Sequence, residues 1–408
     1  MARKQSFHVA LDLGTHKTAV LLAAMSEDEP HVVGLGTAPS AGLRRGVVVN
    51  IDATVEGIRR AVHEAEVMAD CEIQSVVVGV SGSHVKGFNS HGMVPIKGHE
   101  VTSSDIEHVH EAARAVPLPA DRHILHVLPK EYVVDEQEGV RDAQGMAGVR
   151  LEARVHVLTG STPVVENVIK CCNRSGVTVS QIILAPLASA EAVLSPEERD
   201  LGVGMIDIGG GTTDLIVYQG GAVQHTAVLP LGGNHITNDI AAGLQTPAAE
   251  AEKLKQRFGN AVSSAVATDE RIEVPSVGGR GPRRLSRQVL SEIIEPRVDE
   301  MLTLVAEEIS RAGVEGMLTS GLVLTGGTAN LDGIVPLAER VFHGPIRIGT
   351  AVHSGGLGDI VSGPAYATGM GLLQLAGKAS SDASIAPASA GVLSKMKNRM
   401  GDWFREFF

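Results

Sequence analysis

The sequence is poor in cysteine and in aromatic side chains. Of its 408 residues, 3 are cysteines and 3% are aromatic, whereas 47 are glycines. Cys71, Cys171 and Cys172 include no C-x-x-C pair, and a sparse, odd number of cysteines fits a reducing compartment. We interpret them as small buried thiols. The composition predicts many tight turns around cores of Val, Ile, Leu and Ala.

Positive charge and long apolar runs are also scarce. The formal net charge is −12, which argues against a general nucleic-acid-binding protein, because such proteins neutralise phosphates with Lys and Arg. No window approaches the ~20 apolar residues that span a bilayer. The basic start precedes an apolar run that Asp12, His16 and Lys17 interrupt, so we expect no secretory signal and a cytoplasmic chain.

The first candidate site is a turn at the end of an apolar run. Residues 7–13 predict a strand, and 18–25 predict a second strand that returns beside it. The motif D-L-G-T-H-K between them offers a carboxylate for hydrated Mg²⁺, a glycine that lets an anion approach, and donors for phosphate. An ordinary hairpin turn would use similar residues. The candidate ligands are Asp12, Gly14, Thr15 and Lys17.

A second glycine turn follows the predicted strand 203–208, in the motif D-I-G-G-G-T-T-D. Three consecutive glycines expose backbone N–H groups that can cradle phosphate oxygens, and the first Asp again suits hydrated Mg²⁺. The alternative interpretation is that the glycines only allow the strands to pack tightly. The candidate ligands are Asp207, Gly209, Gly210, Gly211, Thr212 and Thr213.

A third turn, L-T-G-G-T-A-N, separates a predicted strand at 322–327 from a helix near 332–342. Its bare backbone would admit a flat ring or a ribose, although an ordinary strand–helix turn would look the same. The candidate ligands are Gly326, Gly327 and Asn330.

The order of the three turns resembles that of the actin, heat-shock chaperone and sugar-kinase superfamily. The resemblance implies an α/β, actin-like two-lobed ATPase fold of two RNase H-like halves, with ATP and Mg²⁺ between them. Asp12 and Asp207 would hold Mg²⁺ through waters. No Walker A motif occurs, and no residue stands out that would orient water toward a γ-phosphate. We therefore expect ATP binding with weak or no hydrolysis.

Several segments resemble the FtsA family of bacterial cell-division proteins in particular. The stretch A-E-K-L-K resembles a bacterial-actin motif, which assigns Glu252 and Lys255 to the nucleoside; a solvated helix face is the alternative. The segments 185–190 and 364–369 resemble the helices that connect the two halves. Residues 84–162 fit the inserted subdomain of the family, which contacts the next subunit or other division proteins.

The resemblance covers nearly the whole chain and implies a division into segments. Residues 235–312 have a mostly helical pattern, with a polar interruption at 274–284. The expected segments are 1–83 and 163–202 with 358–375 for the first lobe core, 84–162 for the inserted subdomain, 203–234 and 311–357 for the second lobe core, 235–310 for its outer subdomain, 376–391 for a flexible linker, and 392–408 for an amphipathic helix.

The segment 392–408 has the pattern of a membrane-surface helix. Its apolar residues recur at i, i+3/i+4 and i+7, and it holds the only Trp and three of the seven Phe. Such a helix lies in the headgroup plane of an anionic membrane. Packing on a core or a partner is the alternative, against which the polar linker argues. The predicted membrane residues are Leu393, Met396, Met400, Trp403, Phe404, Phe407, Phe408, Lys395, Arg399 and Arg405.

A basic island formed by Arg280, Arg283, Arg284 and Arg287 interrupts the acidic sequence. The resemblance implies a dock for the acidic C-terminal tail of the tubulin-like protein FtsZ, with Arg284 and Arg297 as contacts. A solvated loop is the alternative interpretation.

The implied function is that of an ATP-binding division protein that polymerises on the cytoplasmic face of the cell inner membrane. It would be a peripheral protein at the septum that tethers the FtsZ ring and recruits later division proteins. A pilus-assembly adaptor would more typically lack the terminal helix. A sugar or acetate kinase would transfer phosphoryl groups, and a chaperone ATPase would need a further peptide-binding domain.

Overall fold

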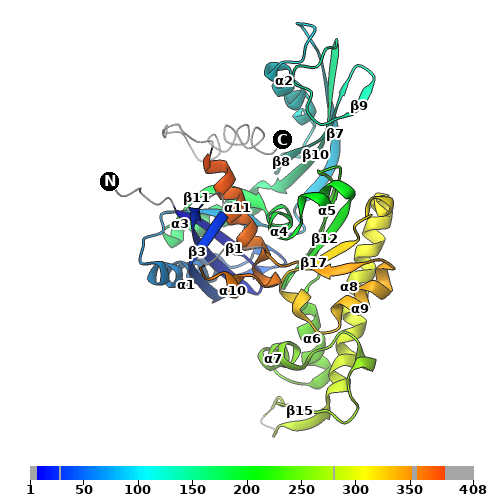
Figure 1. Cartoon of the computed structure of the whole chain (residues 1–408). Helices are drawn as coiled ribbons and strands as arrows, with labels where there is room; N and C mark the ends of the chain where they lie inside the picture. Colours follow the sequence, from blue (N-terminus) through cyan, green and yellow to red (C-terminus); the bar gives the residue numbers. More distant parts are fainter. Residues whose placement is uncertain (1–6, 27–28, 279–280, 352–355, 382–408) are drawn as a thin grey trace.

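The computed structural model describes residues 7–26, 29–278, 281–351 and 356–381. Two lobes, each built on a five-stranded sheet, lie side by side, and a smaller unit with a four-stranded sheet extends beyond them (Figure 1). The mixed α/β, two-lobed architecture predicted from the sequence is confirmed.

The sheet of the first lobe has the strand order β11-β6-β1-β2-β3. β1 pairs antiparallel with β2, and β6 lies parallel on its other side. Side chains alternate across β2, so Thr18 faces Gly57 of one helix while Leu21 faces Gly369 of another. Both faces of this sheet are therefore covered. The bounds are β1 Phe7–Leu13, β2 Lys17–Ser26, β3 Glu29–Pro39, β6 Ser75–Val80 and β11 Thr178–Leu184.

The sheet of the second lobe repeats this plan in the order β14-β13-β12-β17-β18. β12 pairs antiparallel with β13 and parallel with β17. Each lobe therefore has a strand, a glycine turn and a returning strand at its centre, as the motifs at 12–17 and 207–214 predict. The bounds are β12 Val203–Ile208, β13 Thr213–Gln219, β14 Ala222–Leu229, β17 Leu322–Thr325 and β18 Ile346–Ile348.

Four helices surround the first sheet and pack on it or on one another. Asn50 caps α1 by accepting a hydrogen bond from the backbone N–H of Ala53, and Asp70 ends the helix in a left-handed conformation. α4 and α11 pack closely: a Cβ on Gly371 would lie 1.7 Å from the carbonyl oxygen of Ala188. The bounds are α1 Ile51–Ala69, α3 Thr162–Ser175, α4 Ala185–Val193 and α11 Ala367–Ser381.

The outer part of the second lobe is helical with a small hairpin. Three helices follow the pattern predicted for 235–312, and α9 follows the helix predicted near 332–342 in the core of the same lobe. Two short strands flank the polar interruption expected at 274–284. Ile272 and Val274 are buried, a two-residue alternation too short to stand out from its polar neighbours. The bounds are α6 Gly233–Leu244, α7 Ala248–Phe258, β15 Arg271–Val274, β16 Arg283–Ser286, α8 Arg287–Ala312 and α9 Ile334–Phe342.

The unit inserted in the first lobe has its own core and the strand order β7-β10-β8-β9. Thr102 and Asp105 form a capping box at the start of its helix. The unit contacts β14 of the second lobe, where Nε2 of His156 lies 2.9 Å from Oγ1 of Thr226. The bounds are β7 Lys86–Pro95, α2 Ser103–Arg114, β8 Arg122–Val134, β9 Gln137–Val140 and β10 Arg150–Ser161.

One predicted boundary is wrong. α11 continues to Ser381 and buries Ala376. The predicted start of the linker, at residue 376, is therefore too early in the sequence. The small side chains there suit close helix packing as well as a linker. The remainder of 376–391 and the segment 392–408, with its predicted membrane residues, lie outside the described residues. Among the described residues, no helix is long and apolar enough to cross a membrane.

Short elements complete the chain. They are β4 Leu43–Arg44, β5 Val47–Val48, α5 Pro196–Leu201, α10 Gly358–Val361, and the 3-10 turns Ser263–Ala265, Glu315–Met317, Gly327–Asn330 and Pro364–Tyr366.

Candidate functional site

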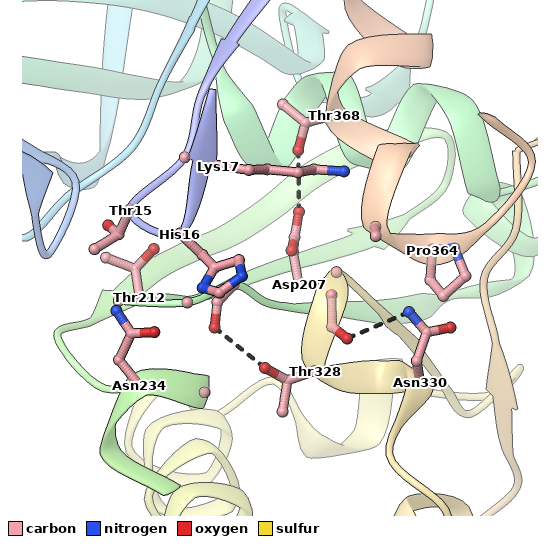
Figure 2. Close-up of a pocket in the computed structure, with 18 of the residues that line it drawn as sticks. Thr15, His16, Lys17, Asp207, Thr212, Asn234, Thr328, Asn330, Pro364 and Thr368 are labelled. Carbon is pink, nitrogen blue, oxygen red and sulfur yellow. Dashed lines mark hydrogen bonds between the residues drawn. The ribbon is translucent and has the colours of Figure 1, made fainter. Parts of the chain in front are cut away.

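A cavity of about 460 Å³ lies between the two lobes, where their central hairpins face each other. Figure 2 shows side chains from both lobes pointing into it, with Lys17 on one side and Thr328 and Asn330 on the other. All but one of the predicted nucleotide ligands line this cavity. They are Asp12, Gly14, Thr15, Lys17, Asp207, Gly209, Gly210, Gly211, Thr212, Glu252, Lys255, Gly326, Gly327 and Asn330.

Thr213 is the exception. It is buried, and its hydroxyl donates a hydrogen bond of 3.0 Å to the carbonyl oxygen of Leu231. Neighbouring side chains point to opposite faces at a strand end, so Thr212 and Thr213 cannot both face the cavity. The prediction of Thr213 as a phosphate ligand is therefore not supported by its position.

The glycines of the second loop allow the two lobes to touch. A Cβ on Gly211 would lie 2.6 Å from Oγ1 of Thr15, and one on Gly210 would lie 2.8 Å from Cβ of His16. The third loop is equally close to the second, because a Cβ on Gly326 would lie 2.3 Å from Oδ1 of Asp207. Any larger side chain would separate the three loops.

Two carboxylates of the predicted metal site face the cavity from opposite lobes. Burial raises the pKa of Asp12 to about 6, with Lys17 opposing and Asp207 reinforcing the rise. Burial also raises the pKa of Asp207, although hydrogen bonds from Ser189 (2.6 Å) and Thr368 (3.4 Å) oppose it. A cation would relieve the cost of ionising both groups, and hard oxygen ligands suit Mg²⁺.

Sequence reasoning missed a third carboxylate, Asp214, on the same cavity wall. Its oxygens accept hydrogen bonds from Ser81 of the first lobe (2.6 Å) and from Thr212 (3.2 Å). Burial, reinforced by Asp207, raises the pKa of Asp214 to about 7. The available signal was the register of the hairpin, which places Asp207 opposite Asp214.

Lys17, which the sequence predicts as a phosphate ligand, has a defined position. Nζ of Lys17 lies 3.3 Å from the centre of the Tyr366 ring, a cation–π contact. Burial lowers the pKa of Lys17, and the charge of Asp12 opposes this shift. The lysine thus lies beside the cavity, with its charge facing an aromatic ring and a carboxylate.

The predicted nucleoside residues form a network on α6 and α7. Nζ of Lys255 lies 2.7 Å from Oε2 of Glu252 and 2.9 Å from Oγ1 of Thr237, which also donates to Glu252. Burial alone would raise the pKa of Glu252, but Lys255 and Thr237 together hold it below its usual value. Across the cavity, Nδ2 of Asn330 donates to the carbonyl oxygen of Gly327 at 3.3 Å (Figure 2).

The basic island is not one open patch. Arg297 forms ion pairs with Asp239 and Glu300, and Arg287 pairs with Glu270. Arg284 lies on β16 opposite Glu273 of β15. Arg280 lies outside the described residues. Of the two predicted contacts for an acidic peptide, Arg297 already has acidic partners, whereas Arg284 is exposed on the hairpin.

Comparisons with known proteins agree with this architecture. Residues 204–371 match the family model for the cell division protein FtsA, and residues 82–159 match the model for the SHS2 domain inserted in FtsA. The chain is 50% identical to the cell division protein FtsA of Pseudomonas aeruginosa over 366 residues, covering 90% of this chain and 88% of that protein. It is 43% identical to FtsA of Escherichia coli, covering 98% of both chains.

Solved structures of low sequence identity share the fold. A chain of the PilM–PilN type IV pilus biogenesis complex superposes with a TM-score of 0.65 at 18% identity, covering 90% of this chain and 98% of that chain. MreB5 of Spiroplasma citri bound to ADP gives a TM-score of 0.52 at 15% identity, covering 90% and 95%. The fold and the interlobe cavity therefore define an actin-like, two-lobed protein with an inserted subdomain.

Within that class, the chain belongs to the FtsA family of cell-division proteins. The cell-division function and the family predicted from the sequence are confirmed. A sugar or acetate kinase and a chaperone ATPase are excluded by this membership, and the likeness to the pilus complex extends to the fold alone.

Proposed function

We propose that this actin-like division protein binds ATP and Mg²⁺ in the cavity between its lobes. The observation that carries the proposal is the convergence of three glycine loops, at 12–17, 207–212 and 326–332, on one cavity. Backbone N–H groups without obstructing side chains suit phosphate oxygens, and the carboxylates at the strand ends suit a hydrated divalent cation.

In this proposal the loops divide the binding of the nucleotide among them. Asp12 and Asp207, from the first two loops, hold Mg²⁺ through waters, while Thr15 and Lys17 donate to the phosphates. Glu252 and Lys255 of α7 contact the nucleoside. Bound Mg²⁺ neutralises the charge of the phosphates. Gly326, Gly327 and Asn330 contact the adenosine. We expect weak or no hydrolysis, with the nucleotide acting mainly on lobe closure and self-assembly into filaments.

Calorimetric titration of the full chain with ATP, with and without Mg²⁺, tests the site. Asp207→Asn removes the charge of a carboxylate that the metal needs, so we expect ATP affinity in Mg²⁺ to fall at least ~tenfold. Thr213→Val is the matched control, because Thr213 is adjacent to the loop but faces the interior. Unchanged ATP affinity in Asp207→Asn would contradict the assignment of the interlobe cavity as the ATP site.

We also propose that residues 392–408 attach the protein, as a peripheral protein, to the cytoplasmic face of the inner membrane at the septum. The support is the sequence pattern of Trp, Phe and basic residues. Flotation with anionic liposomes should recover the full chain but not a chain ending at residue 391, while both bind ATP equally. Equal flotation of the two chains would contradict membrane attachment through residues 392–408.

The partners follow from the same proposal. Arg284, with Arg297, would dock the acidic tail of FtsZ, and the inserted subdomain at 84–162 would contact the next subunit or later division proteins. Arg284→Glu should weaken binding of an acidic FtsZ-tail peptide, measured by fluorescence anisotropy at low salt, where surface charges act most strongly. Arg311→Glu is a control on an exposed arginine of the same lobe. An equal effect of both substitutions would contradict a specific dock.

A further inference from the structure

Arg287, at the start of α8, is the best-connected arginine of the predicted basic island. Its Nε donates a 2.7 Å hydrogen bond to the carbonyl oxygen of Phe258. Its Nη1 lies 3.1 Å from both carboxylate oxygens of Glu270, and Nη2 lies 3.7 Å from Oδ2 of Asp332. The side chain is only 19% exposed. Arg287 therefore faces the protein and not a docking surface.

One of these partners, Asp332, lines the interlobe cavity, and another, Phe258, is the chain neighbour of a lining residue. Phe258 is the last residue of α7, the helix that carries Glu252 and Gln256 into the cavity, and Gly259 beside it lines the cavity. Asp332 ends the third glycine loop and lines the cavity as well. The backbone N–H of Ala261 donates a 2.7 Å hydrogen bond to the carbonyl oxygen of Asp332, which joins the two segments directly.

The chemistry of the guanidinium suits this position. The last carbonyl groups of a helix lack partners within the helix and carry partial negative charge, so a cation there is stabilising. The guanidinium presents its donors in one rigid plane, whereas the ammonium group of lysine is a compact charge on a flexible stem. Glu270 does not line the cavity, and its carboxylate accepts hydrogen bonds from Nη1 of the same guanidinium.

We propose that Arg287 is a positioning residue for the base end of the nucleotide cavity. It holds the end of α7 and the end of the third loop at a fixed separation, so that the surface facing the nucleoside is formed before ligand arrives. The inference rests on the proposed nucleotide function, and it assigns to this arginine a role different from the docking of an acidic peptide.

Calorimetric titration with Mg²⁺ and ATP, at a temperature where circular dichroism shows each variant folded, provides the test. Arg287→Gln should raise the Kd for ATP about tenfold, the equivalent of one lost hydrogen bond to a charged group. Glu270→Gln should raise it less, although Glu270 does not reach the cavity. The double variant should bind ATP no more weakly than Arg287→Gln alone. Both substitutions disrupt the same ion pair, so their effects on the Kd should not add.

Two further variants separate positioning from general stabilisation. Arg340→Gln is the matched control, since Arg340 pairs with Glu295 and Asp299 on the same lobe without reaching the cavity. Its Kd should stay within about twofold of wild type. Arg287→Lys keeps the positive charge but not the planar arrangement of donors, so it should lose less ATP affinity than Arg287→Gln. Should Arg287→Gln fail to fold, Arg287→Lys and Glu270→Gln carry the test.

The outcomes are distinct. A lower melting temperature with unchanged Kd in Arg287→Gln, equal losses in Arg287→Gln and Arg340→Gln, or additive effects of the Arg287 and Glu270 substitutions would each overturn the positioning role. Absence of ATP binding to the wild-type chain would instead overturn the proposed nucleotide function itself.

Discussion

At the scale of single residues, the cavity concentrates acidic side chains whose charges are costly. Asp12, Asp207 and Asp214 all have pKa values raised mainly by burial. Carboxylates in such a cluster bind protons or a cation in preference to remaining ionised without a partner. Ser81 donates a hydrogen bond across the lobes to Asp214, and the two donors to Asp207 also belong to the first lobe.

Asp214 gives a prediction on pH. Its pKa is about 7 in the folded chain and near 3.8 in the unfolded chain. The folded state therefore binds more protons between these values, and the contribution of Asp214 to stability falls as pH rises through that window. In metal-free buffer, the melting temperature of wild type relative to Asp214→Asn should decrease from about pH 4 to about pH 7. A difference that is flat or rises with pH would contradict the raised pKa.

Residue identity predicted the part of the cavity lining that the three glycine loops supply, because glycines and aspartates at strand ends suit phosphate and a hydrated cation. Orientation was harder to predict. Thr212 and Thr213 are alike in sequence, and only the strand direction decides which one faces the cavity. The sequence groups Arg287 with a basic surface, since its acidic partners Glu270 and Asp332 are distant along the chain.

At the scale of elements, α4 and α11 depend on one close approach. Gly371→Ala would place a Cβ 1.7 Å from the backbone oxygen of Ala188, and backbone cannot move aside as a side-chain tip can. We expect a loss of about 3 kcal/mol in the free energy of unfolding, measured by urea denaturation. Gly363→Ala is the control: no atom lies within 4 Å of the Cβ that it would add, so the change should stay below about 0.5 kcal/mol.

A loss in Gly371→Ala no larger than in Gly363→Ala would mean that the two helices are not in contact as described. The long, periodic elements around this contact were predictable from the sequence. Short or weakly patterned ones were not: β7 alternates mainly polar residues, and β15 and β16 have four residues each. Their position depends on tertiary partners, which local patterns do not record.

At the scale of the whole molecule, the two lobes are joined around the cavity by contacts that a ligand would share. A ligand that binds only the folded state stabilises it by an amount that grows with the logarithm of the ratio of ligand concentration to Kd. At ATP concentrations of about 100 times Kd in Mg²⁺, we expect a gain of about 2.7 kcal/mol. At the same ATP concentration the gain in Asp207→Asn should fall to about 1.4 kcal/mol or less, with a correspondingly smaller rise in melting temperature. A rise equal to that of wild type would mean that the ligand binds elsewhere.

A crystal structure of the chain with ATP and Mg²⁺ would show whether the three loops bind the nucleotide. We expect the triphosphate between residues 12–17 and 207–212, the base beside 326–332 and α7, and metal density near Asp12 and Asp207. Nucleotide bound outside the interlobe cavity, or a filled cavity in which these loops do not contact the ligand, would contradict this expectation.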